Sequence, residues 1–214
     1  MTSGAHSMTV PLLHVDAVAK RYTRGLISRN VTFSLEADFV VEAPTVVGVM
    51  GPNGSGKTTL FELITGSNLP STGHVRIAGQ DIHRVRYRER DRLALHYHQS
   101  YQVRAFKRTR PSFMLEAAHS SAPLVHLFDE PQFNTQDGYI GFMVDFFRRL
   151  RRQGKLVFIC LHPNEPWHLE ILRENCERFL FVERGRVTEA SDFAALTANP
   201  AVNAYLGGLS PLSA

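Results

Sequence analysis

The stretch Gly51-Pro52-Asn53-Gly54-Ser55-Gly56-Lys57-Thr58 decides the fold, because it has the pattern of a phosphate-binding loop. Residues 45–50 precede it and form an apolar, β-branched run that is typical of a buried strand. Residues 57–65 follow it and carry apolar side chains at helical spacing up to Gly66. A strand, a glycine loop and a helix in this order predict a binding site for phosphate groups.

The residue types of the loop suit this chemistry. Glycines let the backbone wrap an anion with its N–H groups turned inward, and the start of the helix adds a positive dipole. Lys57 supplies a positive charge for the outer phosphates, and the hydroxyl of Thr58 is a candidate ligand of Mg²⁺. The alternative interpretation is a glycine-rich turn that binds nothing.

The composition indicates one globular α/β domain. The chain has 214 residues, of which 43% are hydrophobic and 21% charged, as in ordinary folded proteins. No apolar run approaches the ~20 residues that a membrane span needs, so we expect no transmembrane segment. Residues 1–9 are polar and predict a flexible tail rather than a signal peptide. Cys160 and Cys176 form neither a disulfide framework nor a metal pattern, which favours a cytoplasmic protein.

Positive charge is unevenly distributed, although the net charge is only +4. Basic side chains gather at residues 84–92, 107–110 and 148–152. Solvated helix faces are one interpretation. The alternative, for the first two clusters, is a surface that contacts nucleic acid or an acidic protein.

The order of predicted elements alternates between strands and helices after the loop. Strands are expected at residues 12–15, 17–22, 30–35, 73–79, 93–98, 124–128, 155–161, 179–183 and 186–189. Helices are expected at 112–122, 139–152 and 167–175, and a capped helix start at 191. Strands separated by helices predict a parallel sheet covered by helices.

Four further matches resemble the ATP-binding cassette family, the ATPases best known as transporter motors. They are the apolar run Leu124-Val-His-Leu-Phe-Asp129-Glu130-Pro131, the run Phe158-Ile-Cys-Leu-His162, Tyr22 and Gln99. With the phosphate loop they occur in the family's order, from about residue 12 to residue 189. The resemblance implies a P-loop NTPase core, in which helices flank a mixed, largely parallel sheet, and an N-terminal antiparallel β-subdomain. The implied domain covers residues 10–206 and is followed by a tail at 207–214.

The resemblance also implies ATP and Mg²⁺ as cofactors and a role for each matching residue. Tyr22 would stack on adenine, and Thr58, Gln99 and Asp129 would hold Mg²⁺. Glu130 would activate the attacking water as general base, while Gln99 and His162 would contact the γ-phosphate. The remaining nucleotide contacts would come from the loop and helix start, namely Gly51, Pro52, Asn53, Gly54, Ser55, Gly56, Lys57, Thr58 and Thr59.

Geometry sets one condition on the two carboxylates. Neighbours along a strand point to opposite sides, so Asp129 and Glu130 can serve one site only where the strand ends or bends. Pro131 is consistent with such a bend. Each site residue also has a structural interpretation. The carboxylates could be a solvated strand end, His162 a structural histidine, Gln99 an ordinary polar residue, and Tyr22 an aromatic side chain that packs in the sheet.

Two parts of the family pattern are missing. The Leu-Ser-Gly-Gly-Gln signature, which caps the ATP of a partner subunit, is replaced at residues 105–109 by Ala-Phe-Lys-Arg-Thr. Only 29 residues, 100–128, separate Gln99 from Asp129, too few for the usual helical subdomain. A Ser-Ala-Leu-Asp turn is likewise replaced at residues 132–137. We therefore expect a reduced helical subdomain and weak hydrolysis by the chain alone.

These observations favour an ATP-hydrolysing subunit of a transporter. Its expected partners are a membrane-spanning subunit and a second ATPase that carries the signature, which would place it in the cytoplasm at the inner face of the cell membrane. The alternative is a soluble, non-transport ATPase or ATP-gated binding module that contacts nucleic acid or an acidic protein. A third hypothesis is a protein that binds ATP for stability and hydrolyses almost none.

Overall fold

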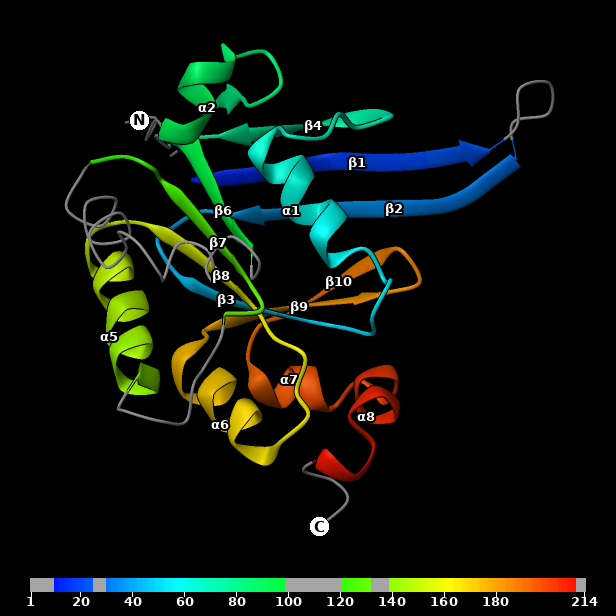
Figure 1. Ribbon diagram of the computed structural model, residues 1–214, viewed down its shortest axis with the longest axis vertical. Coiled ribbons are helices and arrows are strands. Elements are labelled where there is room, and N and C mark those ends of the chain that lie inside the picture. The colour runs from blue at the N-terminus through cyan, green and yellow to red at the C-terminus, as the bar shows by residue number, and fades with distance from the viewer. Residues whose placement is uncertain (1–9, 25–29, 99–120, 132–138, 211–214) are drawn as a thin grey trace, which may run out of the picture.

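The computed structural model describes residues 10–24, 30–98, 121–131 and 139–210 (Figure 1). Their strands form one 10-stranded sheet in the order β5-β4-β1-β2-β10-β9-β3-β8-β7-β6. Gln99, residues 105–109 and 132–137, and all but the end of the expected helix at 112–122 lie outside the described residues.

The half of the sheet that carries the site is parallel. It contains β6 (Ala94–His98), β7 (Val125–Asp129), β8 (Leu156–Cys160), β3 (Val46–Met50) and β9 (Arg178–Glu183). Strands β3, β7 and β8 are buried along their whole length. Helices cover both faces of such a sheet, which is why these strands are continuous apolar runs in the sequence.

The other half is mostly antiparallel. Strand β1 (Leu13–Arg24) pairs with β2 (Asn30–Val41) and with β4 (Thr72–Ile77), and β4 pairs with β5 (Gln80–Asp81). Strand β10 (Arg186–Ala190) is antiparallel to β9 and parallel to β2, and so joins the halves. The expected mixed sheet with an antiparallel N-terminal part is confirmed.

The predicted break in the first strand is wrong. The sequence predicted separate strands at 12–15 and 17–22, whereas β1 is a single strand with a register shift between Val15 and Val18. Ala17 lies in the left-handed region at φ 44°. A β-bulge of this kind interrupts the alternation of side chains without ending the strand.

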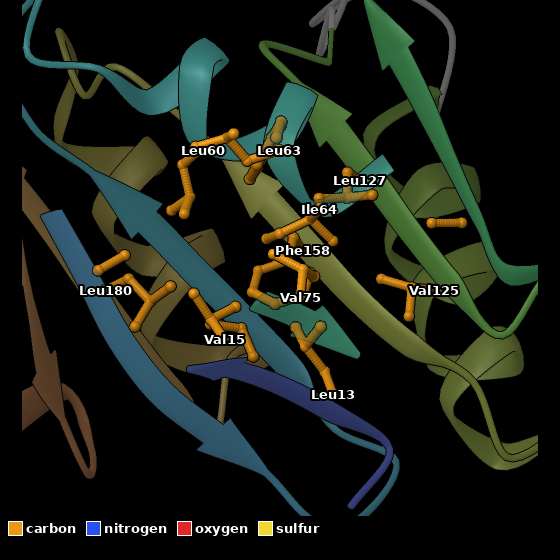
Figure 2. Close-up of a cluster of buried hydrophobic side chains, with 14 of the residues drawn as sticks. Leu13, Val15, Leu60, Leu63, Ile64, Val75, Val125, Leu127, Phe158 and Leu180 are labelled. Carbon is orange, nitrogen blue, oxygen red and sulfur yellow. The ribbon is translucent and has the colours of Figure 1, made fainter. Parts of the chain in front are cut away.

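Two apolar clusters fill the two faces of the sheet. Helix α1 (Lys57–Thr65) covers one face and contributes Leu60, Leu63 and Ile64 to a cluster with Phe158 (Figure 2). Helix α5 (Tyr139–Arg152) covers the other face, with α6 (Pro166–Asn175) and α7 (Phe193–Thr197) beside it (Figure 1). Successive residues of β8 alternate between the clusters, as the period of a strand requires.

Helix limits agree closely with the sequence where capping signals are clear. Helix α1 ends at Gly66, whose φ of 72° is the left-handed conformation that glycine adopts readily. Helix α5 spans the expected residues. Helix α7 begins after Asp192, whose side chain accepts a hydrogen bond from the backbone N–H of Ala195 at 2.8 Å.

Two helices among the described residues were not predicted. Helix α2 (Tyr87–Leu93) lies in the arginine-rich stretch, and α8 (Pro200–Leu206) begins after Asn199. Helix α8 has a recognisable start signal, since Asn199 caps it and proline occupies its first turn. It continues into a 3₁₀ turn at Gly207–Leu209, and Ser210 is buried, so the folded residues reach into the segment that was expected to be a tail.

The connection between β6 and β7 is short. It comprises residues 99–124, which is 26 residues, in agreement with the expected reduction of the helical subdomain. Among the described residues, no helix combines the length and the apolar character that crossing a membrane requires.

Candidate functional site

The phosphate loop connects the end of β3 to the start of α1. Gly51 has a φ of 148°, and a Cβ atom there would collide with the backbone carbonyl of Val182 on β9. Gly56 caps α1 at φ 114°, and a Cβ atom there would lie 2.8 Å from Leu35 and 2.9 Å from Phe33. The shape of the loop therefore depends on glycine at both positions.

Lys57 is held at the mouth of the loop. Only 7% of the residue is exposed, and its Nζ donates hydrogen bonds to the carbonyl oxygens of Gly51 at 2.7 Å and Pro52 at 2.8 Å. An ammonium group carries three N–H donors, so the lysine can fasten the loop and still offer a donor to an anion.

Asp129 and Glu130 follow one another at the end of β7, and the chain bends between them. Glu130 adopts the left-handed φ of 49°, and its backbone N–H donates to the carbonyl oxygen of Cys160 at 2.9 Å. The bend that the two carboxylates require is thus present. It is a positive φ at Glu130 itself, a conformation that costs energy in a residue with a side chain.

A cavity of about 280 Å³ brings the loop and the two carboxylates together. Its lining consists of Phe33, Asn53, Gly54, Gly56, Lys57, Thr58, Thr59, Asp129 and Glu130. Six of the predicted site residues other than glycines line the cavity, whereas Pro52 and Ser55 of the loop do not. Ser55 Oγ is buried, and among the described residues it has no hydrogen-bond partner.

Two residues proposed to bind Mg²⁺ touch each other in this cavity. The hydroxyl of Thr58 donates to Oδ2 of Asp129 at 3.0 Å. Neighbouring oxygen ligands in an octahedral Mg²⁺ shell, with bonds of about 2.1 Å, are about 3 Å apart. The described residues contain no group of three or more His, Cys, Asp or Glu side chains that could hold a metal by themselves. Two protein oxygens with further ligands from phosphate and water fit Mg²⁺ in this setting.

The environment of Asp129 keeps its carboxyl group ionised. Burial raises its pKa, but hydrogen bonds from His96 and Thr58 outweigh this effect, and the pKa lies below its ordinary value of 3.8. Nε2 of His96 lies 3.4 Å from Oδ2 of Asp129. An ionised carboxylate is the form that binds a cation.

Sequence reasoning did not predict His96. It lies on β6, which runs parallel to β7, and its ring also meets the edge of Phe61 on α1 at 5.4 Å between centroids. The only signal in the sequence was the position of His96 three residues before Gln99, whereas the pairing of its strand with the strand of Asp129 is known from the structure.

His162 and Tyr22 lie outside the lining of this cavity. His162 follows β8, and its Nδ1 makes a hydrogen bond of 2.8 Å with the hydroxyl of Tyr205 on α8. Tyr22 is 36% exposed, and its hydroxyl accepts a hydrogen bond from Nδ2 of Asn68 at 2.7 Å. The position of Gln99 is not described.

Phe33 is the aromatic residue that lines the cavity. It pairs with Tyr22 across strands β1 and β2, and the two ring centroids are 6.1 Å apart. Sequence reasoning assigned the nucleobase to Tyr22 and did not consider Phe33. Only the register of the two strands shows that Phe33 reaches the loop at Gly56.

Comparison with known proteins connects this site to one family. Residues 35–132 match the family model described as ABC transporter. The lipopolysaccharide export system ATP-binding protein LptB of Acidithiobacillus ferridurans is 36% identical over 86 residues, which cover 40% of this chain and 33% of LptB. The nickel import ATP-binding protein NikE of Pseudomonas putida is 35% identical over 101 residues, which cover 46% of this chain and 32% of NikE. The matched region thus spans about a third of the length of these relatives.

Solved structures of ATP-binding cassettes share the fold over a much larger part of the chain. The ADP form of the cassette MJ1267 aligns with a TM-score of 0.66 at 16% identity and covers 94% of this chain and 100% of that one. The dimeric cassette MJ0796 bound to ADP and Pi aligns with a TM-score of 0.62 at 17% identity and covers 84% and 98% of the two chains.

Proposed function

From the premise that the chain belongs to the ATP-binding cassette family, we propose that it binds and hydrolyses ATP with Mg²⁺ as the motor subunit of a transporter. The observation that carries this proposal is the cavity in which Lys57, Thr58, Asp129 and Glu130 meet. These side chains supply the positive charge, metal ligands and general base that phosphoryl transfer to water requires.

The loop binds and orients the phosphates. Its backbone N–H groups and the start of α1 would face the bound phosphates, and Lys57, which lines the cavity, would add a full positive charge. Thr58 and Asp129 would hold Mg²⁺. When bound, the ion would neutralise charge on the phosphate oxygens. Thr59 and Asn53 complete the wall of the cavity.

In this proposal Glu130 accepts a proton from the attacking water. Its left-handed backbone turns it toward the cavity wall that it shares with Asp129. Asp129 is fixed by Thr58 and His96, so the two adjacent carboxylates divide the work between metal binding and base catalysis. In this proposal His162, which lies outside the lining of this cavity, and Gln99 act on the γ-phosphate.

We base the proposed transporter role on the similarity to these relatives, and we base the proposed reaction on the residues of the site. One of the relatives named above serves export and the other serves import. The similarity therefore supports a subunit that binds nucleotide, but it does not identify the transported substrate. The missing signature at residues 105–109 supports a second, signature-bearing ATPase as partner. With a membrane-spanning subunit as the second partner, the proposed location of the protein is the cytoplasmic face of a membrane.

The test is nucleotide binding followed by reconstitution. Titration of the full chain with a non-hydrolysable ATP analogue should show saturable binding that strengthens when Mg²⁺ is added. Partners captured by tagged protein from membranes and from the cytosol should include a multi-span protein and a signature-bearing ATPase, and mixing with that ATPase should stimulate hydrolysis. Absence of saturable binding by folded protein would refute the site, and ATPase activity unaffected by every captured partner would refute the transporter role.

One observation favours the second candidate, a non-transport ATPase that contacts nucleic acid. Arg84, Arg86, Arg88 and Arg92 are exposed on α2 and just before it, next to the exposed ring of Tyr87. Glu89 and Asp91 on the same helix reduce this positive charge. DNA or RNA affinity that falls steeply with salt would favour this candidate, and no binding at low salt would eliminate it.

A further inference from the structure

The hydroxyl of Tyr205 and the imidazole of His162 form a contact that no sequence motif indicates. His162 follows β8, whereas Tyr205 comes from α8 near the C-terminal end of the described residues. The hydroxyl oxygen and Nδ1 are 2.8 Å apart, and the ring centroids 5.7 Å. The tyrosine ring is itself held against Phe181 of β9, with centroids 5.8 Å apart.

We assign the donor in this contact from the chemistry of the hydroxyl. Burial raises the pKa of Tyr205 above its ordinary value, so the group is a neutral phenol with one proton to give. An imidazole nitrogen without a proton is an acceptor, and Nδ1 of His162 lies 2.8 Å from the phenol oxygen. In the direction that we assign, the phenol O–H donates to Nδ1 of His162.

A hydrogen bond that Nδ1 accepts from a neighbouring group fixes the tautomer of a neutral histidine. When Nδ1 accepts a hydrogen bond, the ring proton resides on Nε2, and Nε2–H becomes the donor on the opposite edge of the ring. A phosphate oxygen can only accept hydrogen bonds, so an imidazole that contacts it must present N–H rather than a lone pair.

We propose that Tyr205 is a positioning residue, which through its hydroxyl holds His162 as the Nε2–H tautomer and aims this N–H toward the terminal phosphate of the nucleotide. The role of His162 in this statement rests on the proposed function. The contact also links helix α8 to the segment that follows β8.

The direct test is ¹⁵N–¹H correlation spectroscopy of the full chain with ¹⁵N-labelled histidine, without nucleotide, using His162→Ala to assign the signals. In the wild type, Nδ1 of His162 should have the shift of an unprotonated, hydrogen-bonded nitrogen and Nε2 that of a protonated one. Tyr205→Phe keeps the ring that packs on Phe181 and removes only the hydroxyl, so it should shift both nitrogens toward the mixed-tautomer values of a free imidazole. Tyr87→Phe removes a hydroxyl from an exposed tyrosine and should change neither signal.

A second experiment measures the effect of the substitution on ATP hydrolysis. Tyr205→Phe should lower kcat about three- to ten-fold, as expected for one lost hydrogen bond, with nucleotide affinity unchanged. In the His162→Ala background the same change should have no further effect, because Tyr205 acts through His162.

The two arms separate this inference from the proposed function. A wild-type spectrum with the proton on Nδ1, or a Tyr205→Phe spectrum identical to the wild type, would overturn the positioning role whatever the protein hydrolyses. A spectrum as expected in a protein that neither binds nor hydrolyses ATP would leave the tautomer assignment standing and overturn the proposed function.

Discussion

The hydroxyl of Thr58 lies 3.0 Å from Oδ2 of Asp129, although the two residues are 71 positions apart in the sequence. Thr58 is the second residue of α1, and Asp129 is the last residue of β7, a strand two places along the sheet from β3, which precedes the loop. Parallel strands present their carboxyl ends at one edge of the sheet, and the helix that follows β3 starts at the same edge. The contact is therefore a consequence of topology, and it creates the pair of oxygens to which we assign Mg²⁺.

Replacing Asp129 by Asn should remove the Mg²⁺-dependent part of nucleotide binding. The substitution keeps the size of the side chain but removes the charge that binds a cation. We therefore expect the gain in nucleotide affinity that Mg²⁺ produces to become about 10- to 100-fold smaller. Titration of Mg²⁺ at fixed analogue concentration measures this. Thr58→Val, which removes the other oxygen, should act in the same direction. Unchanged Mg²⁺ dependence in both variants would refute the assignment.

Lys57→Ala should weaken nucleotide binding at least about 10-fold, because the variant loses a charge-assisted hydrogen bond to phosphate. Arg149→Ala removes a positive charge from an exposed position on α5 and serves as the matched control for a change in net charge. Isothermal titration of both variants gives the comparison. Equal affinities in the two variants would mean that Lys57 does not contact the ligand.

Glu130→Gln should retain ATP and stop its hydrolysis. The amide cannot accept a proton from water, so the rate should fall about 10²- to 10⁴-fold while the affinity for ATP is preserved. Single-turnover hydrolysis in the presence of the signature-bearing partner measures the rate. Glu170→Gln, an exposed change on α6, should leave it unaltered. A Glu130→Gln variant with the wild-type rate would show that another group is the base.

Phe33→Ala and Tyr22→Ala distinguish two candidates for contact with the nucleobase. Aromatic stacking on a base contributes about 1–3 kcal/mol, so loss of the stacking ring should weaken ATP binding about 5- to 100-fold. Because Phe33 lines the cavity, we expect the larger loss from Phe33→Ala. Tyr22→Phe removes only the hydroxyl that contacts Asn68 and should change little. A larger loss from Tyr22→Ala would restore the assignment made from the sequence.

Stability should decline in mild acid because of His126. This residue is fully buried on β7, where burial, together with the charge of Lys155, lowers its pKa from 6.5 to about 4. Below pH 6.5 the unfolded chain binds a proton that the folded chain does not, so the free energy of unfolding falls as the pH drops from 6.5 toward 4. From this group alone we expect a loss of about 2 kcal/mol at pH 5.

Denaturant unfolding at pH 7.5, 6 and 5 measures this loss. The control is the double variant His126→Phe, Tyr97→Phe. It keeps the stack of rings and leaves no unpaired hydroxyl where Tyr97 Oη now contacts His126 Nδ1 at 3.0 Å. Its stability should depend less on pH than that of the wild type, and an identical dependence would contradict the role of His126.

Much of the fold could be predicted because its signals are local. The limits of α1 follow from the loop before it and from Gly66 after it, and the buried strands around it are apolar runs that only a sheet covered on both faces produces. Residues such as His96 could not be predicted in the same way, because a histidine within a strand carries no local mark of its partner on the next strand.

Short segments of sequence were enough to identify the phosphate loop, the strand that ends in Asp129, the order of these elements and the resemblance to the ATP-binding cassette family. Those features depend on residue type and spacing within short segments. Only the tertiary structure decided that Phe33 rather than Tyr22 reaches the cavity, that His96 contacts Asp129, and that Tyr205 meets His162. Each of these pairings joins segments that are distant in the chain, and strand register and helix packing, which no single segment encodes, fix which side chains meet.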